Sequence, residues 1–389
     1  MQKTLLGKDV TTGSAVEVIF DQTIEAVRPS SAAPEVYLSP GWIDVQVNGF
    51  AGVDYNVGVT SQEEIARSIE VLFSTGVTRF YPTVITGSPD DMLSALRNLA
   101  RAKDSLADGE SMDGFHVEGP HISPDDGPRG AHPRHWVRPP DVEEFARWQE
   151  ATGGAIRLVT LAPEWPQAPH YIEALTAAGV VISIGHTNAT GPQIADAVSA
   201  GATMSTHLGN GAHQMLHRHP NYIWEQLAED RLSASFIVDG IHLPVSFLKP
   251  ALRAKGLHRS VLVTDASSPA GAAPGRYTLG EQMVDLTPDN RVVLAGQDKL
   301  AGSALRMDHG VQNLMRLVGL PLADAVTLAT TNPARVGGVP GRQQGLAAGD
   351  RADFVLFRFD ARSSKIQVES TYLSGRRVWG GPLAGLARA

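Results

Sequence analysis

Cysteine is absent from all 389 residues of the chain. Its absence excludes disulfide bonds, thiolate nucleophiles and zinc sites built from cysteine. Any metal ion that the protein binds must therefore be held by histidine and carboxylate side chains. The missing cysteines leave the redox compartment of the protein open.

Long apolar runs and dense basic runs are also missing. No stretch approaches the roughly 18 apolar residues of a membrane-spanning helix, and Met1 to Asp9 lack the apolar core of a signal peptide. We therefore expect a cytoplasmic protein with no membrane partner. The formal charge of −8, without clustered Lys and Arg, argues against nucleic acid as a partner.

The residues that are present are typical of a folded α/β protein. Hydrophobic residues make up 42% of the chain, and 39 glycines with 25 prolines indicate many loops. From Pro40 onward, strand-like and helix-like patterns alternate. The first helix is expected from Thr60 to Thr75, because Thr60 or Ser61 can cap its start and Gly76 can end it. Eight strands are predicted, at Trp42–Asn48, Val77–Val84, Phe115–Glu118, Ile156–Leu161, Val180–Gly185, Ala202–Thr206, Leu232–Val238 and Val261–Thr264.

Eight β-then-α units favour a parallel (β/α)8 TIM-like barrel over an open doubly wound sheet. The chain ends have the alternating pattern of antiparallel strands. We expect residues 1–39 and 341–389 to form one small β domain and residues 40–340 to form the barrel. Two insertions interrupt the barrel pattern, namely a loop at residues 119–140 and a hairpin at residues 276–294. Loops as long as the first are usually lids or binding loops.

Several predicted strands end in side chains that can do chemistry. The third strand ends at Glu118, the fifth at His186, the sixth at His207 and the eighth at Asp265, while His242 follows the seventh. Because the strands of a parallel barrel end at one rim, we expect these residues to converge. Two imidazoles and one carboxylate form a common ligand set for a catalytic divalent ion.

Each of these residues also has a plainer interpretation. A single histidine at a strand end is more often a hydrogen-bonded core or surface group than a ligand. A buried carboxylate such as Glu118 needs a compensating partner, however, and three coincidences favour a metal held by Glu118, His186 and His207. Asp265 is then the candidate general base and acid, and His242 the group that stabilises an oxyanion. This set indicates metal-assisted hydrolysis of an amide or ester. The roles of four other histidines stay open: His121, His213, His217 and His219.

Short motifs between Pro40 and Gly349 carry a family resemblance. They are Pro40 to Gly49, His116 to Pro120, Gly130-Ala131-His132, Gly185-His186-Thr187, Thr206-His207-Leu208, Asp239-Gly240-Ile241-His242, Thr264-Asp265-Ala266, Leu300 to Ser303 and Thr331 to Ala334. In their order and spacing these motifs resemble the N-acetylglucosamine-6-phosphate deacetylase family of the amidohydrolase superfamily.

The resemblance implies a distorted barrel, a small β-sandwich built from both chain ends, a homodimer, and hydrolysis of the acetamide of an amino-sugar phosphate to the free amine and acetate. Carried over by position, Glu118, His186 and His207 would hold the metal, which is expected to be Zn²⁺, with Fe²⁺ or another divalent ion as alternatives. Asp265 would be the general base and acid, and His242 would polarise the carbonyl. The sugar site would be lined by Ala131, His132, Asn210, Gly211, Leu300, Ala301 and Gly302.

Two departures from the family pattern stand out. Many amidohydrolases carry His-x-His on the first strand, where this chain has Gln46 and Asn48. A single metal is the consequence, and we place both amides in the substrate site. The family also has an arginine that binds phosphate in the neighbouring subunit. Arg218 falls at the matching distance, in the altered surroundings of His217 and His219.

The predicted function is metal-dependent removal of the N-acetyl group of an N-acetyl amino sugar, foremost N-acetylglucosamine 6-phosphate. The altered surroundings of Arg218 leave open a second hypothesis, a deacylase of an unphosphorylated N-acyl sugar or another N-acyl compound. A third, a scaffold without catalysis, is disfavoured, because the chain retains all five residues of the chemical set: Glu118, His186, His207, His242 and Asp265.

Overall fold

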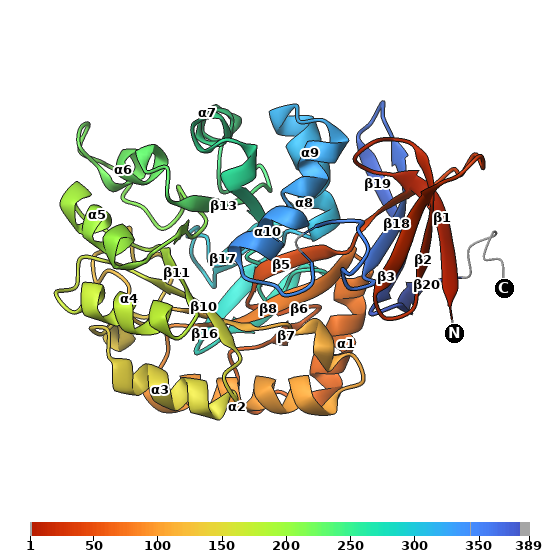
Figure 1. The fold of residues 1–389 in the computed structure, drawn as a ribbon. Coiled ribbons are helices and arrows are strands. Elements are labelled where there is room, and N and C mark those ends of the chain that lie inside the picture. The colour runs from red at the N-terminus through yellow and green to blue at the C-terminus, as the bar shows by residue number, and fades with distance from the viewer. Residues whose placement is uncertain (1, 343, 382–389) are drawn as a thin grey trace.

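The eight predicted strands form one parallel sheet that curves into a barrel (Figure 1). The computed structural model describes residues 2–342 and 344–381. In sheet order the strands are β5 (Trp42–Val47), β8 (Val77–Ile85), β9 (Phe115–Glu118), β10 (Ile156–Leu161), β11 (Val181–Ile184), β12 (Met204–Ser205), β13 (Ser233–Ile237) and β14 (Ser260–Val263). Each strand pairs in parallel with the next. The predicted (β/α)8 fold is confirmed.

The barrel closes between its first and last strands, β5 and β14, with little backbone pairing. In the described chain this junction carries an isolated parallel bridge between Val47 and Ala266. The backbone N–H of Asn48 also donates to the carbonyl oxygen of Ala266 over 2.7 Å. Because a full ladder is missing here, side chains must contribute to closure, and the barrel is distorted at this point.

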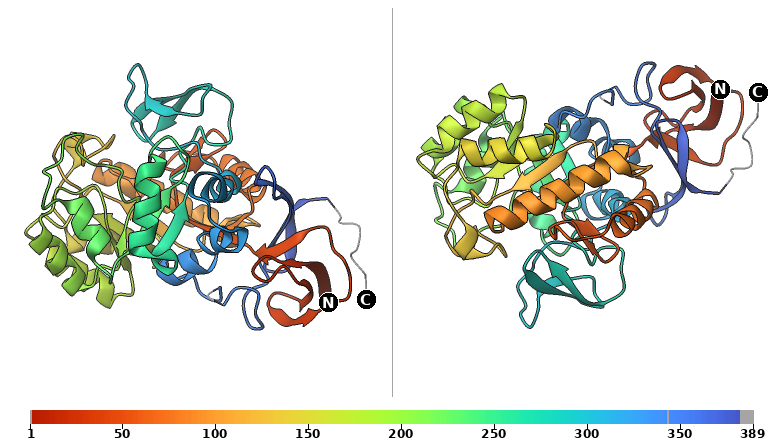
Figure 2. Two further views of the ribbon diagram at one scale, coloured as in Figure 1. Left: turned by 90° about the horizontal axis from the view of Figure 1, so that it is seen from above. Right: turned by 90° about the horizontal axis from the view of Figure 1, so that it is seen from below.

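Helices cover the outside of the barrel (Figure 2). Ser61 caps the first one in a capping box with Glu64, and Ser88 followed by Pro89 starts the second, as such residues commonly do. Apolar residues of these helices, such as Ile65 and Leu96, pack into the main core. The helices are α1 (Gln62–Phe73), α2 (Pro89–Ser105), α3 (Val142–Ala151), α4 (Ala168–Ala177), α5 (Gly191–Ala200), α6 (Tyr222–Ala228), α7 (Val245–Lys255), α8 (Met307–Asn313), α9 (Leu322–Thr327) and α10 (Thr331–Val336). None of the described helices is long and apolar enough to cross a membrane.

The two chain ends form a second sheet beside the barrel (Figure 1). Its strands, in order, are β20 (Arg376–Gly380), β19 (Lys365–Leu373), β18 (Phe354–Asp360), β4 (Tyr37–Pro40), β1 (Lys3–Asp9), β2 (Ala15–Phe20) and β3 (Ile24–Pro29). Phe20 on β2 lies 5.0 Å from Phe354 on β18, measured between ring centroids, although two strands separate β2 from β18 in the sheet. The sheet therefore folds over itself like a sandwich. We propose that the boundaries between the small β domain and the barrel lie at residues 40 and 341. Residues 1, 343 and 382–389 of the predicted small domain lie outside the described residues.

The two insertions lie together. The hairpin expected at residues 276–294 is a three-stranded antiparallel sheet of β15 (Gly275–Leu279), β16 (Gln282–Leu286) and β17 (Val292–Leu294), which protrudes from the barrel in Figure 2. Its apolar side chains form a cluster of their own, against which Ala131 of the 119–140 loop packs. A short two-stranded piece, β6 (Gly49–Phe50) and β7 (Val53–Asp54), follows the first barrel strand.

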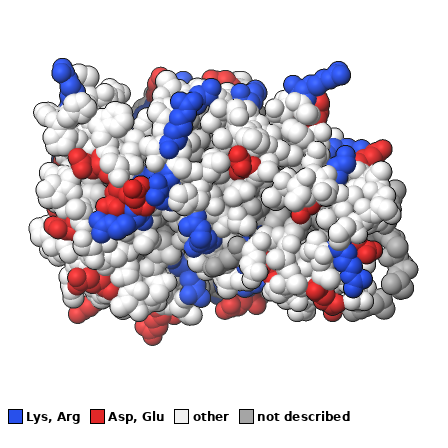
Figure 3. All heavy atoms as spheres, turned by 45° about the horizontal axis from the view of Figure 1, so that its top comes forward, with Lys and Arg blue, Asp and Glu red and all other residues white. Residues whose placement is uncertain are grey.

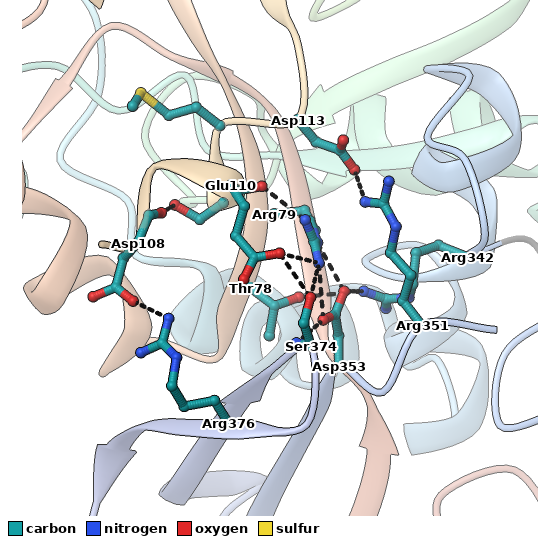
Figure 4. A network of polar contacts seen from close by, with 12 residues as sticks. Thr78, Arg79, Asp108, Glu110, Asp113, Arg342, Arg351, Asp353, Ser374 and Arg376 are labelled. Atoms are coloured by element: carbon teal, nitrogen blue, oxygen red, sulfur yellow. Dashed lines mark hydrogen bonds and ion pairs between the residues drawn. The ribbon is translucent and has the colours of Figure 1, made fainter. Parts of the chain in front are cut away.

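A buried ion cluster joins the small sheet to the barrel (Figure 4). The Asp353 carboxylate, directly before β18, accepts from Arg79 Nε of β8 over 2.8 Å and from Arg342 Nη1 over 2.7 Å. Burial opposes the charge of Asp353, but Arg342 and Arg79 hold its pKa well below the usual range. Buried charges are stable only when paired in this way. Elsewhere, on the face shown in Figure 3, positive and negative side chains are interspersed.

Candidate metal and catalytic site

The barrel brings three of the predicted residues into one buried cluster. Glu118 ends β9, while His186 and His207 each lie two residues beyond the end of their strands, β11 and β12. One ligand atom from each lies within 4.8 Å of the others. All three side chains are nearly inaccessible to solvent. Their convergence follows from topology, since parallel strands end at the same rim.

Three of the predicted residues have a left-handed backbone. The φ angles are 51° at His186, 28° at His207 and 50° at Asp265. This region is unfavourable for residues with a Cβ atom, and it persists only where the surroundings hold the chain firmly. At the ends of these strands the fold therefore holds the backbone in a strained conformation that orients the side chains of His186, His207 and Asp265.

The geometry of the cluster suits a divalent metal ion. His186 Nδ1 lies 2.8 Å from the carbonyl oxygen of Pro128, which can only accept, so Nδ1 donates there and Nε2 is the ring nitrogen that faces the cluster. The Nε2 atoms of His186 and His207 lie 3.1 Å and 2.9 Å from the same oxygen, Oε1 of Glu118. Burial alone would raise the pKa of Glu118, but its contacts with the two histidines lower it well below the usual range. Two imidazole nitrogens and one carboxylate oxygen form a donor set that zinc and iron accept.

Asp265 lies beside the cluster and is held by two amides at the end of strand β5, Gln46 in the strand and Asn48 directly after it. Asn48 Nδ2 donates to Asp265 Oδ1 over 2.7 Å, and Gln46 Nε2 donates to the same oxygen over 3.0 Å. Gln46 Nε2 also lies 3.0 Å from Glu118 Oε2. Burial and the neighbouring charge of Glu118 raise the pKa of Asp265 to about 6. A carboxylate with a pKa near neutrality is suited to proton transfer.

His242 is oriented by a carboxylate that the sequence prediction did not assign to the site. Its Nδ1 lies 2.6 Å from Asp239 Oδ2, and the other Asp239 oxygen accepts from the backbone N–H groups of Ile241 and His242. Burial opposes ionisation of Asp239, yet these hydrogen bonds lower its pKa. The imidazole is thus fixed through Nδ1, and Nε2 is left for a ligand.

Residues predicted to line the sugar site lie next to His186. The His132 ring packs edge to face against the His186 ring at 4.4 Å, and its Nδ1 lies 2.8 Å from Thr86 Oγ1. Burial and the neighbouring His186 lower the pKa of His132 to about 3, so the ring is neutral at physiological pH. Gly211 approaches the same histidine from the opposite loop, and a Cβ atom at that position would lie 2.6 Å from His186 Nδ1.

Two further predicted segments border the cluster. The amide Nδ2 of Asn210 is buried without a hydrogen-bond partner among the described residues, so a donor is available there. The segment Leu300 to Gly302 leads directly to Ser303, whose backbone N–H donates to the carbonyl oxygen of Asp265 over 3.1 Å. At Gly302, where φ is 73°, a Cβ atom would lie 2.8 Å from Ser267 Oγ. The close backbone approach explains the glycine.

The remaining predicted residues lie elsewhere. Arg218, with its neighbours His217 and His219, is exposed on the segment between β12 and α6. His213 is half-buried, and its ring and backbone N–H both contact the hydroxyl of Tyr222. His121 is fully buried outside the cluster, where it packs against aromatic rings and its Nδ1 contacts the carbonyl oxygen of Arg138.

Sequence reasoning gave no role to several residues that hold the site, notably Asp44, Asp239 and Pro128. The sequence did contain a signal for Asp44. Like Glu118, it is an acid within an apolar strand, and its buried charge needs a compensating partner. Pro128 acts through its backbone carbonyl group, which no side-chain pattern reveals.

Comparison with known proteins agrees with the family resemblance of the sequence motifs. The model of the amidohydrolase family matches residues 37–378. The chain is 33% identical to N-acetylglucosamine-6-phosphate deacetylase of Bacillus subtilis, and the match covers 92% of this chain and 94% of the relative. It is 35% identical to the human enzyme of that name, and that match covers 88% of this chain and 83% of the relative. A solved structure of a mutant of the Mycobacterium smegmatis enzyme, in complex with N-acetyl-D-glucosamine-6-phosphate, is 31% identical and superposes with a TM-score of 0.86, covering 97% of this chain and 99% of that one.

Proposed function

The chain belongs to the amidohydrolase family, and from this we propose that it hydrolyses the acetamide of N-acetylglucosamine 6-phosphate to glucosamine 6-phosphate and acetate. The observation that carries the proposal is the buried cluster of Glu118, His186 and His207 directly beside Asp265. Metal-assisted amide hydrolysis needs a ligand set and an adjacent proton carrier, and both are present.

We propose that Glu118, His186 and His207 hold one divalent ion, Zn²⁺ in the first place, with Fe²⁺ as the alternative. When bound, such an ion polarises the carbonyl group of the amide and makes a water molecule more acidic. Gln46 and Asn48 occupy the positions where a second pair of ligands would be expected, and both donate hydrogen bonds instead. One ion per chain is therefore the proposed stoichiometry.

The protein groups around the cluster have distinct tasks. Asp265 accepts a proton from the attacking water and later delivers a proton to the departing amine, for which its pKa of about 6 is suited. His242, held at Nδ1 by Asp239, presents Nε2 to the carbonyl oxygen, where negative charge develops. The neutral His132 and the free amide of Asn210 are placed to bind the sugar hydroxyls.

We also propose a homodimer in which Arg218 binds the 6-phosphate of the substrate in the partner's site. The exposure of Arg218 supports a role outside its own buried cluster. Met215 is 89% exposed and Trp224 is 54% exposed close to Arg218 in the sequence, and such side chains are enriched at protein interfaces. Light scattering tests this, with an expected mass of twice 41.4 kDa. A phosphorylated sugar is too polar to cross a bilayer unaided, so we propose a cytoplasmic location for the enzyme.

The test is a panel of N-acyl sugars and their 6-phosphates, with acetate release and metal content measured on the same sample. We expect N-acetylglucosamine 6-phosphate to be the best substrate and activity to disappear on chelation and return with metal. Asp265→Asn should lose about 10²–10⁴-fold in kcat, as expected for a general base, whereas Asp289→Asn, in an exposed turn, should not. A preference for the plain sugar would instead support the deacylase hypothesis, and activity of Asp265→Asn would refute the mechanism.

A further inference from the structure

A further buried carboxylate, Asp44, lies next to the site and has no task in the reaction described above. Asp44 lies in the middle of β5 and is completely inaccessible to solvent. Burial raises its pKa to about 7, so the fold holds this group where its charge is unfavourable. The residues on either side of Asp44 in the strand, Ile43 and Val45, are buried aliphatic residues.

Two of the hydrogen bonds that Asp44 accepts come from Thr264, the residue before Asp265, and a third comes from the backbone N–H of Gln46 over 3.3 Å. Asp44 Oδ2 accepts from the hydroxyl of Thr264 over 2.5 Å, and Oδ1 accepts from the backbone N–H of Thr264 over 3.3 Å. Thr264 Oγ1 in turn accepts from the backbone N–H of Ala266 over 3.1 Å. The residues on both sides of Asp265 are thereby tied to one carboxylate on the opposite strand.

Backbone geometry explains why such a tie is needed. Asp265 has a φ angle of 50°, which is unfavourable for an aspartate within a chain and requires support from its surroundings. On one side Ser303 donates from its hydroxyl to the carbonyl oxygen of Thr264 over 2.6 Å. On the other side the barrel closes between β5 and β14 with only an isolated backbone bridge among the described residues, so the Asp44–Thr264 pair supplies contacts that a full ladder would otherwise make.

We propose that Asp44 is a positioning residue for Asp265, acting through Thr264 to hold the left-handed turn that directs the Asp265 carboxylate to Gln46 and Asn48. The inference rests on the proposed function in one respect, the role of Asp265 as general base. Strand β5 then controls Asp265 twice. The amides of Gln46 and of Asn48, the residue after the strand, hold the carboxylate, and Asp44 holds the backbone.

Four variants separate this role from a purely structural one. Thr264→Val removes the hydroxyl at constant shape, Thr264→Ser retains it, and Asp44→Asn replaces the acceptor Oδ2. Asp353→Asn is the control, because Asp353 is equally buried but lies in the ion cluster with the small sheet. We expect Asp44→Asn and Thr264→Val to lower kcat by about 10–100-fold, the range for a slightly misplaced catalytic group, with KM and bound metal within about twofold of the wild type. Thr264→Ser, which retains the hydroxyl, should have the kcat of the wild type.

The control defines the contrary result. Asp353→Asn is expected to lower Tm while leaving kcat of the folded, metal-loaded enzyme unchanged. If Asp44→Asn and Thr264→Val behave in the same way, with a lower Tm and an unchanged kcat, Asp44 merely closes the barrel and the proposal is overturned.

Crystal structures of the same variants give a readout that does not depend on activity. We expect Asp265 in Thr264→Val to leave the left-handed region or to lose its hydrogen bond from Asn48, and to keep both in Thr264→Ser. An unchanged Asp265 in Thr264→Val and Asp44→Asn would refute the positioning role. An inactive wild-type enzyme whose variants still show the displacement would refute the proposed function alone.

Discussion

At the scale of single residues, the site consists of buried polar groups, several of which are held by a defined partner. Glu118 contacts two histidines and Gln46, His186 is fixed by the carbonyl oxygen of Pro128, and His242 is fixed by Asp239. Buried carboxylates and imidazoles are stable only with such partners. The same contacts select the nitrogen of His186 that faces the cluster.

The first prediction concerns Glu118. Glu118→Gln should abolish stoichiometric metal binding, because the amide is a poor ligand and removes the negative charge from the set. Metal per chain, measured after dialysis against a metal-buffered solution, should fall from about one towards zero. Glu63→Gln, on the exposed face of α1, is the control and should bind metal like the wild type. Full metal occupancy in Glu118→Gln would contradict the ligand assignment.

At the scale of elements, the two insertions act together on the substrate side of the barrel. Gln282 at the start of β16 donates to the carbonyl oxygen of Ala131 in the 119–140 loop over 2.5 Å. Trp136 of that loop donates to Glu281 over 3.0 Å. The three-stranded sheet thus holds the loop that carries Ala131 and His132 to His186, the loop for which a role in substrate binding is proposed.

The second prediction follows from this contact. Gln282→Leu should raise KM by about 2–10-fold, the effect of one lost hydrogen bond, with a smaller change in kcat. Steady-state kinetics with N-acetylglucosamine 6-phosphate measures both. Met283→Gln, at an exposed position on the same strand, should leave KM unchanged. A wild-type KM in Gln282→Leu would show that the loop keeps its position without the contact.

At the scale of the whole molecule, the small sheet and the barrel are joined by charges that neither part could bury alone. Arg79 comes from the barrel, Asp353 immediately precedes the small sheet, and Arg342 lies between them in the sequence. Ser374 donates from its backbone N–H to Asp353 over 2.7 Å and completes the set of partners. The two sheets are therefore expected to unfold together.

The third prediction tests this junction. Asp353→Asn leaves two buried guanidinium groups without their carboxylate and should lower the free energy of unfolding by about 3–5 kcal/mol. Urea denaturation at pH 7 measures the loss. Asp108→Asn, in a half-exposed pair with Arg376, should lower it by less than about 1 kcal/mol. Equal effects of the two substitutions would refute the importance of the buried cluster.

The effect of Asp353→Asn on the free energy of unfolding should depend on pH. The pKa of Asp353 is depressed in the folded protein, so the unfolded chain takes up protons first as the pH falls. The contribution of Asp353 to stability is therefore complete above the ordinary aspartate pKa of about 4 and is lost as the pH falls below it. The difference in unfolding free energy between wild type and Asp353→Asn should be constant from about pH 7 to 5 and shrink below about pH 4. A difference that grows on acidification would contradict the sign.

The amino-acid sequence by itself determined the fold class, the strand order along the chain and which residues are candidates for the site. Periodic apolar positions, helix caps such as Ser61 and Ser88, and polar groups at strand ends are local signals, and local signals can be recognised without a structure. The convergence of Glu118, His186 and His207 could be predicted because topology alone brings the ends of parallel strands to one rim.

Only the tertiary structure decided how those residues are held. The contact of His186 with the carbonyl oxygen of Pro128 and the tie from Asp44 to Thr264 join segments far apart in the sequence. The left-handed turns at His186, His207 and Asp265 are held by such surroundings. The third strand of the insertion, β17, was also hidden within the predicted hairpin. Contacts of this kind depend on the register and closure of the barrel, which no single stretch of the chain encodes.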